Sequence, residues 1–238
     1  MNHAAAVVHV DRLELSFVRE PWAFADDNRA VIDAYFAALR RATPALWNGR
    51  VLMMVRHALE GAVFRGWYVE TDYASFTAWR HWGHARAERD CFGAAAVISS
   101  DGAVLLGLMS ERTVNAGRLY FFCGTPDLND VADGRVDLDF SVTRELKEES
   151  GLAITELEAE PGWTTVVEAA RIAHIKVLRS RQDAESLRVR MLAHLAGEAH
   201  PELSDICIVR GIADIDRTMP RFVTAFLEHR FGRSTPCP

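Results

Sequence analysis

Three glutamates, Glu145, Glu148 and Glu149, lie at positions i, i+3 and i+4. In a helix this spacing places the side chains on one face. Like charges so arranged oppose helix formation by about 0.2–0.5 kcal/mol per pair. A hard divalent cation prefers several oxygen ligands and would turn this repulsion into a binding site. The alternative interpretation is a solvated acidic face of a surface helix.

The residues around these glutamates predict a short helix with a defined end. Val142 and Leu146 are spaced i and i+4 and would form its buried side. Gly151 can adopt the left-handed conformation that commonly ends helices, and Leu152 can pack back on the last turn. The three carboxylates would then occupy the last turns of an anchored helix.

The stretch from Arg144 to Leu152 resembles the second half of the Nudix box. That box reads Gly-x5-Glu-x7-Arg-Glu-U-x-Glu-Glu-x-Gly-U, with U aliphatic, and Arg144 to Leu152 fits it without a mismatch. The resemblance implies Mg²⁺ as cofactor, with Mn²⁺ as a substitute, and Glu145, Glu148 and Glu149 as metal ligands. It also implies that Arg144 pairs with a helix carboxylate and holds its rotamer.

The first half of the box fits less well. Its glycine is best placed at Gly124, but nineteen residues separate Gly124 from Arg144 where the pattern expects thirteen. The position eight residues before Arg144, where the pattern would place its first Glu, holds Val136. The intervening 127–135 stretch is rich in turn-forming residues and predicts an enlarged loop.

Hydrolysis also needs a base and contacts to the substrate. The family often takes a general base from a Glu outside the box, and Glu202 is our first candidate, with Glu198 as an alternative. Arg144, Glu148 and Glu149 complete the catalytic set that we expect. Glu149 or another glutamate of the helix could act as the base instead of Glu202. Both outer glutamates could equally be ordinary surface acids.

Candidate substrate-binding residues lie around the strand that leads to Gly124. Gly124 would let the backbone approach a metal or phosphate closely, although it could also be a simple turn glycine. Arg112 and Arg118 precede this strand and could contact phosphate. The alternative for both is a solvated arginine.

Composition limits the classes of partner. The 238-residue chain has a formal net charge of −6 and a pI of about 5.9, so it lacks the overall basic field that attracts nucleic acid. No apolar run approaches the roughly 20 residues that span a membrane. The four cysteines show no Cys-x-x-Cys spacing, and the N-terminal sequence is a poor secretion signal. We therefore expect a cytoplasmic protein without a nucleic-acid or membrane partner.

The chain divides into a predicted α+β extension, residues 1–88, and a predicted Nudix domain, residues 89–238. Strands packed between helices imply an α/β/α sandwich in the second part, and the resemblance implies the same fold with a mixed sheet. The patterns predict helices at 26–41, 73–82, 183–195 and 219–231, in addition to the acidic helix, and strands at 51–55, 67–70, 92–98, 104–109, 119–122, 164–167, 171–178 and 206–209.

The leading hypothesis is a Mg²⁺-dependent hydrolase that cleaves the pyrophosphate bond of a nucleoside diphosphate linked to another moiety. A nucleotide sugar is one candidate, because Trp47-Asn48-Gly49 and the 71–76 segment faintly resemble the N-terminal extension of Nudix pyrophosphatases acting on UDP-sugars. The alternative is a catalytically weak Nudix-fold module that binds such a ligand or has a regulatory role. The aromatic residues of the first part could form a homodimer interface or simply its core.

Overall fold

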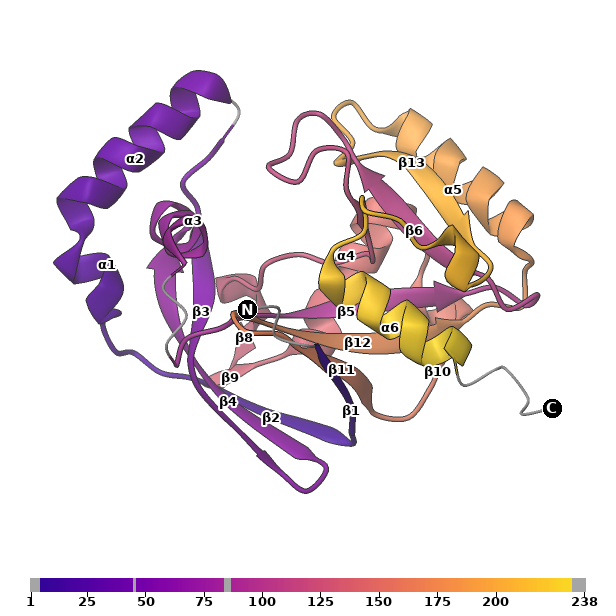
Figure 1. Ribbon diagram of the computed structural model, residues 1–238, viewed down its shortest axis with the longest axis horizontal. Helices are drawn as coiled ribbons and strands as arrows, with labels where there is room; N and C mark the ends of the chain where they lie inside the picture. Colours follow the sequence, from indigo (N-terminus) through magenta and orange to yellow (C-terminus); the bar gives the residue numbers. More distant parts are fainter. Residues whose placement is uncertain (1–4, 45, 84–86, 233–238) are drawn as a thin grey trace.

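The computed structural model describes residues 5–44, 46–83 and 87–232, which form six α-helices and two mixed β-sheets (Figure 1). The helices are α1 (Ala23–Asp27), α2 (Arg29–Ala42), α3 (Tyr73–Trp82), α4 (Leu138–Ser150), α5 (Ala184–Gly197) and α6 (Arg221–Gly232). None of the helices in these residues is long and apolar enough to cross a membrane.

The larger sheet has the order β1-β11-β12-β5-β6-β13, and β12 and β5 are its parallel pair. Its strands are β1 (Ala6–Val10), β5 (Asp90–Ile98), β6 (Val104–Met109), β7 (Leu119–Tyr120), β10 (Glu158–Ala159), β11 (Trp163–Val167), β12 (Arg171–Arg179) and β13 (Leu203–Val209). The short strands β7 and β10 pair with β6 and β12.

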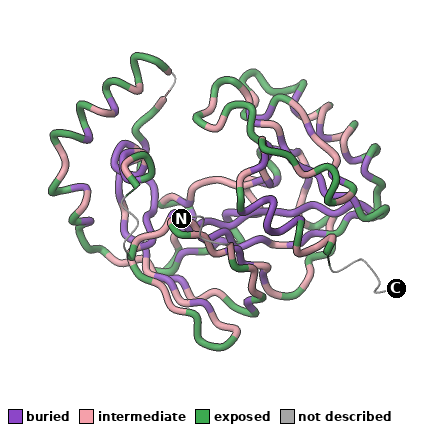
Figure 2. The backbone as a smooth tube through the Cα atoms, in the orientation of Figure 1, coloured by how far each residue is buried: buried purple, intermediate pink, exposed green. Residues whose placement is uncertain are grey.

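Helices cover both faces of the larger sheet. On β5, Cys91 and Val97 point into a core that also contains residues of α4 and α5. Phe92 and Ala94 point to the opposite face, where they join the core that contains α6. Alternation of side chains along the strand thus serves two cores, and buried residues follow these central strands (Figure 2). The predicted α/β/α sandwich with a mixed sheet is confirmed.

The smaller sheet has the order β3-β4-β2-β9-β8. Its strands are β2 (Arg12–Phe17), β3 (Arg50–Glu60), β4 (Val63–Asp72), β8 (Val131–Ala132) and β9 (Arg135–Val136). One face packs against α3 through a cluster that includes Val51, Phe76 and Trp79. Leu52 and Phe64 instead belong to the core that contains α4. The two sheets therefore share a hydrophobic core.

Strand pairing crosses the predicted division at residues 88 and 89 in both directions. Strand β1 pairs antiparallel with β11 of the larger sheet. Strands β8 and β9, which follow Gly124, extend the smaller sheet through the pair Ser16 and Arg135. Neither sheet is built from one part alone. The division into domains at residues 1–88 and 89–238 stays a prediction.

The predicted enlarged loop at 127–135 is ordered. It contains a 3₁₀ turn at Leu128–Asp130 and the β8–β9 hairpin. The hairpin turn uses Asp133 at φ 50° and Gly134 at φ 73°. Positive φ at both central residues is the requirement of a type I′ turn, for which Asp-Gly is a favoured sequence. The insertion thus joins the region of the acidic helix to the smaller sheet.

Candidate active site

The acidic helix forms as predicted and is capped at both ends. The Asp137 side chain accepts a hydrogen bond from the backbone N–H of Phe140 at the N-terminus of α4. Gly151 ends the helix at φ 71°. Val142 and Leu146 are fully buried against the larger sheet. These contacts fix the rotation of α4 and therefore the direction in which its glutamates point.

The glutamates of α4 share a cavity of about 210 Å³ with the segment between α5 and β13. The cavity is lined by Glu145, Glu148, Glu149, Leu195, Glu198, His200 and Glu202. The structure therefore brings together the three predicted metal ligands, the predicted base Glu202 and its alternative Glu198. They come from segments about fifty residues apart in the sequence.

Crowding of carboxylates in this cavity changes their protonation. Burial, and then the charges of Glu148 and Glu202, raise the pKa of Glu145 to about 7, although the Arg144 charge acts in the opposite direction. Burial and the charges of Glu145 and Glu202 raise the pKa of Glu149 well above its ordinary value. Burial, followed by the Glu148 charge, also raises the pKa of Glu202. Each carboxylate thus opposes ionisation of its neighbours.

Arg144 contacts carboxylates on and off its own helix. Its Nη1 lies 2.7 Å from Glu145 Oε1 and 3.5 Å from Glu148 Oε2. Its Nη2 donates to Asp130 Oδ1 at 3.2 Å and to Oδ2 at 3.3 Å. Arg144 therefore bridges the acidic helix and the 3₁₀ turn of the enlarged loop.

Asp130 was not predicted, and it corrects our reading of the first half of the box. Val136, at the expected position of the first Glu, is buried in the hydrophobic core. Asp130 is also buried and supplies the carboxylate beside Arg144. It is the sixth residue after Gly124, which is the Gly-x5-acid spacing of the box. If the pattern is counted forward from Gly124 and the insertion is placed after Asp130, the sequence alone identifies Asp130 as the acidic residue of the first half of the box.

The backbone before the insertion packs directly against the glutamates of α4. The N–H of Cys123 donates to Glu149 Oε2 at 2.8 Å. A Cβ atom on Gly124 would lie 2.2 Å from Glu145 Oε1, which is far inside a normal contact. Glycine at position 124 thus allows the close approach of loop and helix. Burial raises the pKa of the Cys123 thiol well above its ordinary value, so this cysteine is a neutral packing residue.

The donor set fits a hard divalent cation in its chemistry. The cavity offers several carboxylates, and a cation would offset the burial and the mutual repulsion that raise the pKa values of Glu145, Glu149 and Glu202. Within 5–44, 46–83 and 87–232, no three His, Cys, Asp or Glu side chains stand close enough together to hold an ion as placed. Glu145 is engaged by Arg144, whereas the side chain of Glu148 is 60% exposed. Metal binding would therefore require these side chains to rotate toward one another.

The two predicted substrate arginines lie outside this cavity. Arg112 Nη1 contacts His200 Nδ1, and His200 lines the cavity, so Arg112 is at its edge. Arg118 Nη1 donates to the backbone carbonyl of Arg217 at 3.0 Å. Both arginines are exposed. Their roles in substrate binding stay predictions.

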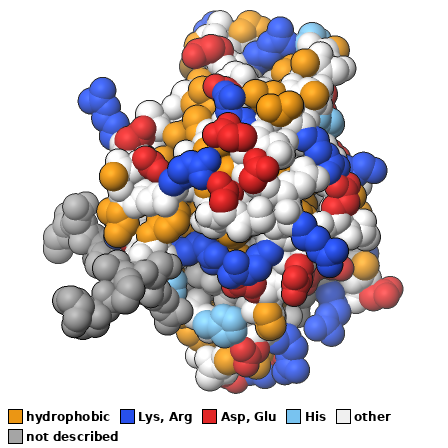
Figure 3. All heavy atoms as spheres, turned by 90° about the vertical axis from the view of Figure 1, so that its right-hand side faces the viewer, with side chains coloured by type: hydrophobic (Ala, Val, Ile, Leu, Met, Phe, Trp, Pro, Cys, Tyr) orange, Lys and Arg blue, Asp and Glu red, His pale blue; other side chains and the backbone are white. Residues whose placement is uncertain are grey.

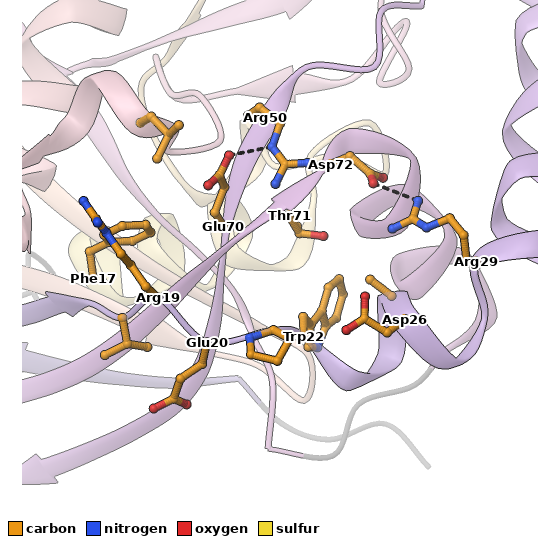
Figure 4. Close-up of a pocket in the computed structure, with 14 residues that line it drawn as sticks. Phe17, Arg19, Glu20, Trp22, Asp26, Arg29, Arg50, Glu70, Thr71 and Asp72 are labelled. Atoms are coloured by element: carbon orange, nitrogen blue, oxygen red, sulfur yellow. Dashed lines mark hydrogen bonds and ion pairs between the residues drawn. The ribbon is translucent and has the colours of Figure 1, made fainter.

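A further cavity of about 610 Å³ lies between the segment before α1 and the end of β4, and Leu128 of the 3₁₀ turn also lines it (Figure 4). Two of its arginines already have partners. Arg29 Nη1 lies 2.8 Å from Asp72 Oδ2, and Arg50 Nε lies 2.6 Å from Glu70 Oε1. Because none of the predicted site residues lines this cavity, it does not bear on the acidic site.

Comparison with protein-family models and with curated proteins finds no match. Among the solved structures that match is a Nudix hydrolase. This protein, RenU from M. smegmatis, is 12% identical, with a TM-score of 0.40 over 62% of this chain and 87% of that one. The MutT protein from Methanosarcina mazei Go1 is 17% identical, with a TM-score of 0.41 over 62% and 98% of the two chains. The E. coli ORF135 protein is 16% identical, with a TM-score of 0.36 over 63% and 96%. Similarities of this size do not by themselves assign a function.

Proposed function

We propose that the chain is a metal-dependent Nudix hydrolase that cleaves the pyrophosphate bond of a nucleoside diphosphate linked to another moiety. The observation that carries the proposal is the position of the box-like segment. Its three glutamates share one cavity with Glu202, and the glycine expected by the same pattern, Gly124, packs against Glu145. A solvated acidic helix face would not require such contacts.

Glu145, Glu148 and Glu149 would hold the metal, with Mg²⁺ as the cation and Mn²⁺ as a substitute. A bound divalent metal neutralises phosphoryl charge and lowers the pKa of a bound water. Arg144 positions two of these carboxylates through its contacts with Glu145 and Glu148. Glu149 is held by the Cys123 N–H, so its orientation is set by the backbone before the insertion.

Glu202 would act as the general base. Its carboxylate lines the same cavity, and burial raises its pKa toward the range in which a carboxylate accepts a proton efficiently. Glu149 is a weaker candidate, because its Oε2 already accepts a hydrogen bond from Cys123 and it is buried. In the proposal, Glu202 removes the proton from the attacking water, and the products are a nucleoside monophosphate and a phosphorylated remainder.

The proposed substrate is a small molecule, and a nucleotide sugar is one candidate. Acidic and basic side chains are interspersed over the face shown in Figure 3, without the broad basic surface that nucleic-acid binding requires. The proposal places the protein in the reducing cytoplasm, because the described cysteines Cys91, Cys123 and Cys207 are free. We also propose that two copies of the protein form a homodimer.

The second candidate function is a module that binds such a ligand without cleaving it. The observation in its favour is the engagement of Glu145 by Arg144, which leaves the metal ligands apart. A panel of nucleoside diphosphate compounds, assayed with Mg²⁺ for phosphate after coupling to a phosphatase, separates the two candidates. Magnesium-dependent turnover supports the hydrolase. Ligand binding without turnover of any compound would reject it in favour of the module.

A further inference from the structure

A third cavity, of about 60 Å³, is lined by Cys123 and Gly124 but not by the glutamates of α4. Its remaining lining residues are Arg80, Asp90, Phe92, Met109, Asn115, Tyr120, Thr125 and Arg171. An adjoining cavity of about 380 Å³ shares Arg80, Asp90 and Arg171. The backbone that contacts the acidic site thus also borders a pocket whose charged side chains are mainly basic.

The three charged residues at the junction of the two cavities form one cluster. Arg171 Nε donates to Asp90 Oδ2 at 3.2 Å, and Arg80 Nε lies 3.9 Å from the same oxygen. Two guanidinium groups therefore face one carboxylate, and the cluster carries one net positive charge. Glu168 lines the adjoining cavity but not the one that reaches Gly124.

Both arginines keep donors available after pairing with Asp90. The contacts of Arg80 and Arg171 with Asp90 are made through Nε in both cases, which leaves the Nη donors of each guanidinium for a ligand. A guanidinium offers two parallel N–H donors that match the oxygens of a phosphoryl or carboxylate group. The cluster is therefore held together by its contacts with Asp90, and its remaining guanidinium donors can bind an oxyanion.

Aromatic rings hold these guanidinium groups in place. The Arg171 guanidinium lies 6.0 Å from the ring centre of Phe92 and 5.4 Å from that of Phe222. The Arg80 guanidinium lies 5.6 Å from the ring centre of Phe76. Their side chains are only 19% and 31% exposed. A charge held by rings and partly removed from water binds an anion more strongly than a solvated arginine does.

We propose that Arg80 and Arg171 bind an anionic group, phosphoryl or carboxylate, in the part of the substrate that lies beyond the scissile diphosphate. The inference rests on the proposed function, because Cys123 and Gly124 line this pocket and also contact the glutamates of α4. Asn115 and Tyr120 line the same cavity and would contact the intervening part of the ligand. The preferred substrate would thus carry an additional negative charge.

Arg80 gives the first part of the chain a role in specificity. It lies in the last turn of α3, which Gly83 ends at φ 72°. Helix α3 packs on the smaller sheet through Phe76 and Trp79. Because the two sheets share a core, this helix is held in a fixed position beside β5, where Asp90 lies. The N-terminal elements therefore complete a substrate pocket.

Binding of inorganic phosphate, and separately of acetate, to the metal-free full-length protein tests the pocket without any turnover. Titration calorimetry at low ionic strength would be compared for the wild type, Arg80→Gln and Arg171→Gln. Arg181→Gln, which changes an exposed arginine away from the pocket, is the matched control. We expect each pocket variant to weaken binding of at least one anion about tenfold, and the control to leave it unchanged. Equal binding by all four proteins would overturn the inference.

Arg171 is the more buried arginine, so its variant could fail to fold. Arg80→Gln keeps the test decisive, because Arg80 is more exposed and its distance to Asp90 is longer. The spectrum by circular dichroism checks the fold of each variant. Loss of anion binding in folded Arg80→Gln supports the inference, and unchanged binding contradicts it.

Pairs of substrates that differ by one anionic group connect the pocket to catalysis. UDP-glucuronate against UDP-glucose tests a carboxylate, and coenzyme A against dephospho-coenzyme A tests a phosphate. We expect a KM about tenfold lower for the more anionic member of one pair, and loss of that preference in Arg80→Gln. A preference retained by the variant would overturn the inference. Anion binding that depends on Arg80, together with no turnover of any compound, would retain the pocket and reject the hydrolase.

Discussion

Replacement of Glu145 by glutamine should stabilise the metal-free protein above neutral pH. Glu145 has a side chain only 13% exposed, and burial raises its pKa from 4.5 to about 7. Between these values the folded state binds more protons than the unfolded state. The free energy of unfolding therefore falls as the pH rises through this window. Glutamine does not ionise, so the free energy of unfolding of the variant does not fall for this reason.

The pKa of Glu145 sets the size of the effect. At about 1.4 kcal/mol per pH unit, a rise from 4.5 to about 7 corresponds to about 3 kcal/mol. The favourable effect of the Arg144 charge is already contained in that pKa. The free energy of unfolding of Glu145→Gln minus that of the wild type should thus increase by about 3 kcal/mol between pH 4.5 and pH 8.

Urea unfolding of both proteins in EDTA, at pH 4.5 and at pH 8, measures this gain. The Glu145 charge also raises the pKa of Glu149, so its removal lowers that pKa and adds to the gain at pH 8. Contributions of titrating groups that do not face Glu145 are common to both proteins and cancel in the difference. A second series with excess Mg²⁺ should stabilise the wild type at pH 8 but not the variant, because a ligand that binds only the folded state raises stability. A difference between the two proteins that stays constant with pH, or that favours the wild type at pH 8, would refute the reasoning.

Three further changes test other parts of the site. Gly124→Ala should change stability by less than about 1 kcal/mol, because the added Cβ meets only the end of the Glu145 side chain, which can rotate away at the expense of its contact with Arg144. The variant should weaken Mn²⁺ binding in a calorimetric titration; unchanged affinity would contradict the close contact. Asp130→Asn should reduce turnover, since Arg144 loses a charged partner; turnover equal to that of the wild type would show that Asp130 does not position Arg144. Burial lowers the pKa of His174 to about 3, so below about pH 6.5 the unfolded state takes up a proton that the folded state does not, and stability is lost as the pH falls toward 3. His174→Gln should lessen this acid sensitivity in urea unfolding, and an identical pH slope would exclude His174 as its source.

Local signals were sufficient to predict the elements that carry the chemistry. The predicted helix 73–82 coincides with α3, and Arg144 to Gly151 lies in and directly after α4. These elements have strong periodicity and capping residues close in sequence. The predicted helix 26–41 is divided into α1 and α2 around Asn28, whose side chain donates to the backbone carbonyl of Phe24.

The strands that were missed depend on partners far away in the sequence. Strand β1 has its partner in β11, more than 150 residues later. Strands β8 and β9 have two residues each and exist because they pair with each other and because β9 pairs with β2. Such pairing is set by tertiary context rather than local propensity. Asp130 was missed for a related reason, since the insertion moved it away from the expected distance to Arg144.

The central claim is that the carboxylates of α4 hold a metal that the hydrolysis requires. The most direct test measures Mg²⁺-dependent turnover and Mn²⁺ binding in parallel for the wild type, Glu148→Gln and Glu185→Gln. Glu148 and Glu185 are both exposed glutamates in helices, but only Glu148 lines the acidic cavity. We predict that Glu148→Gln loses turnover and binds Mn²⁺ at least tenfold more weakly, while Glu185→Gln equals the wild type. Full turnover and metal affinity in folded Glu148→Gln would contradict the claim.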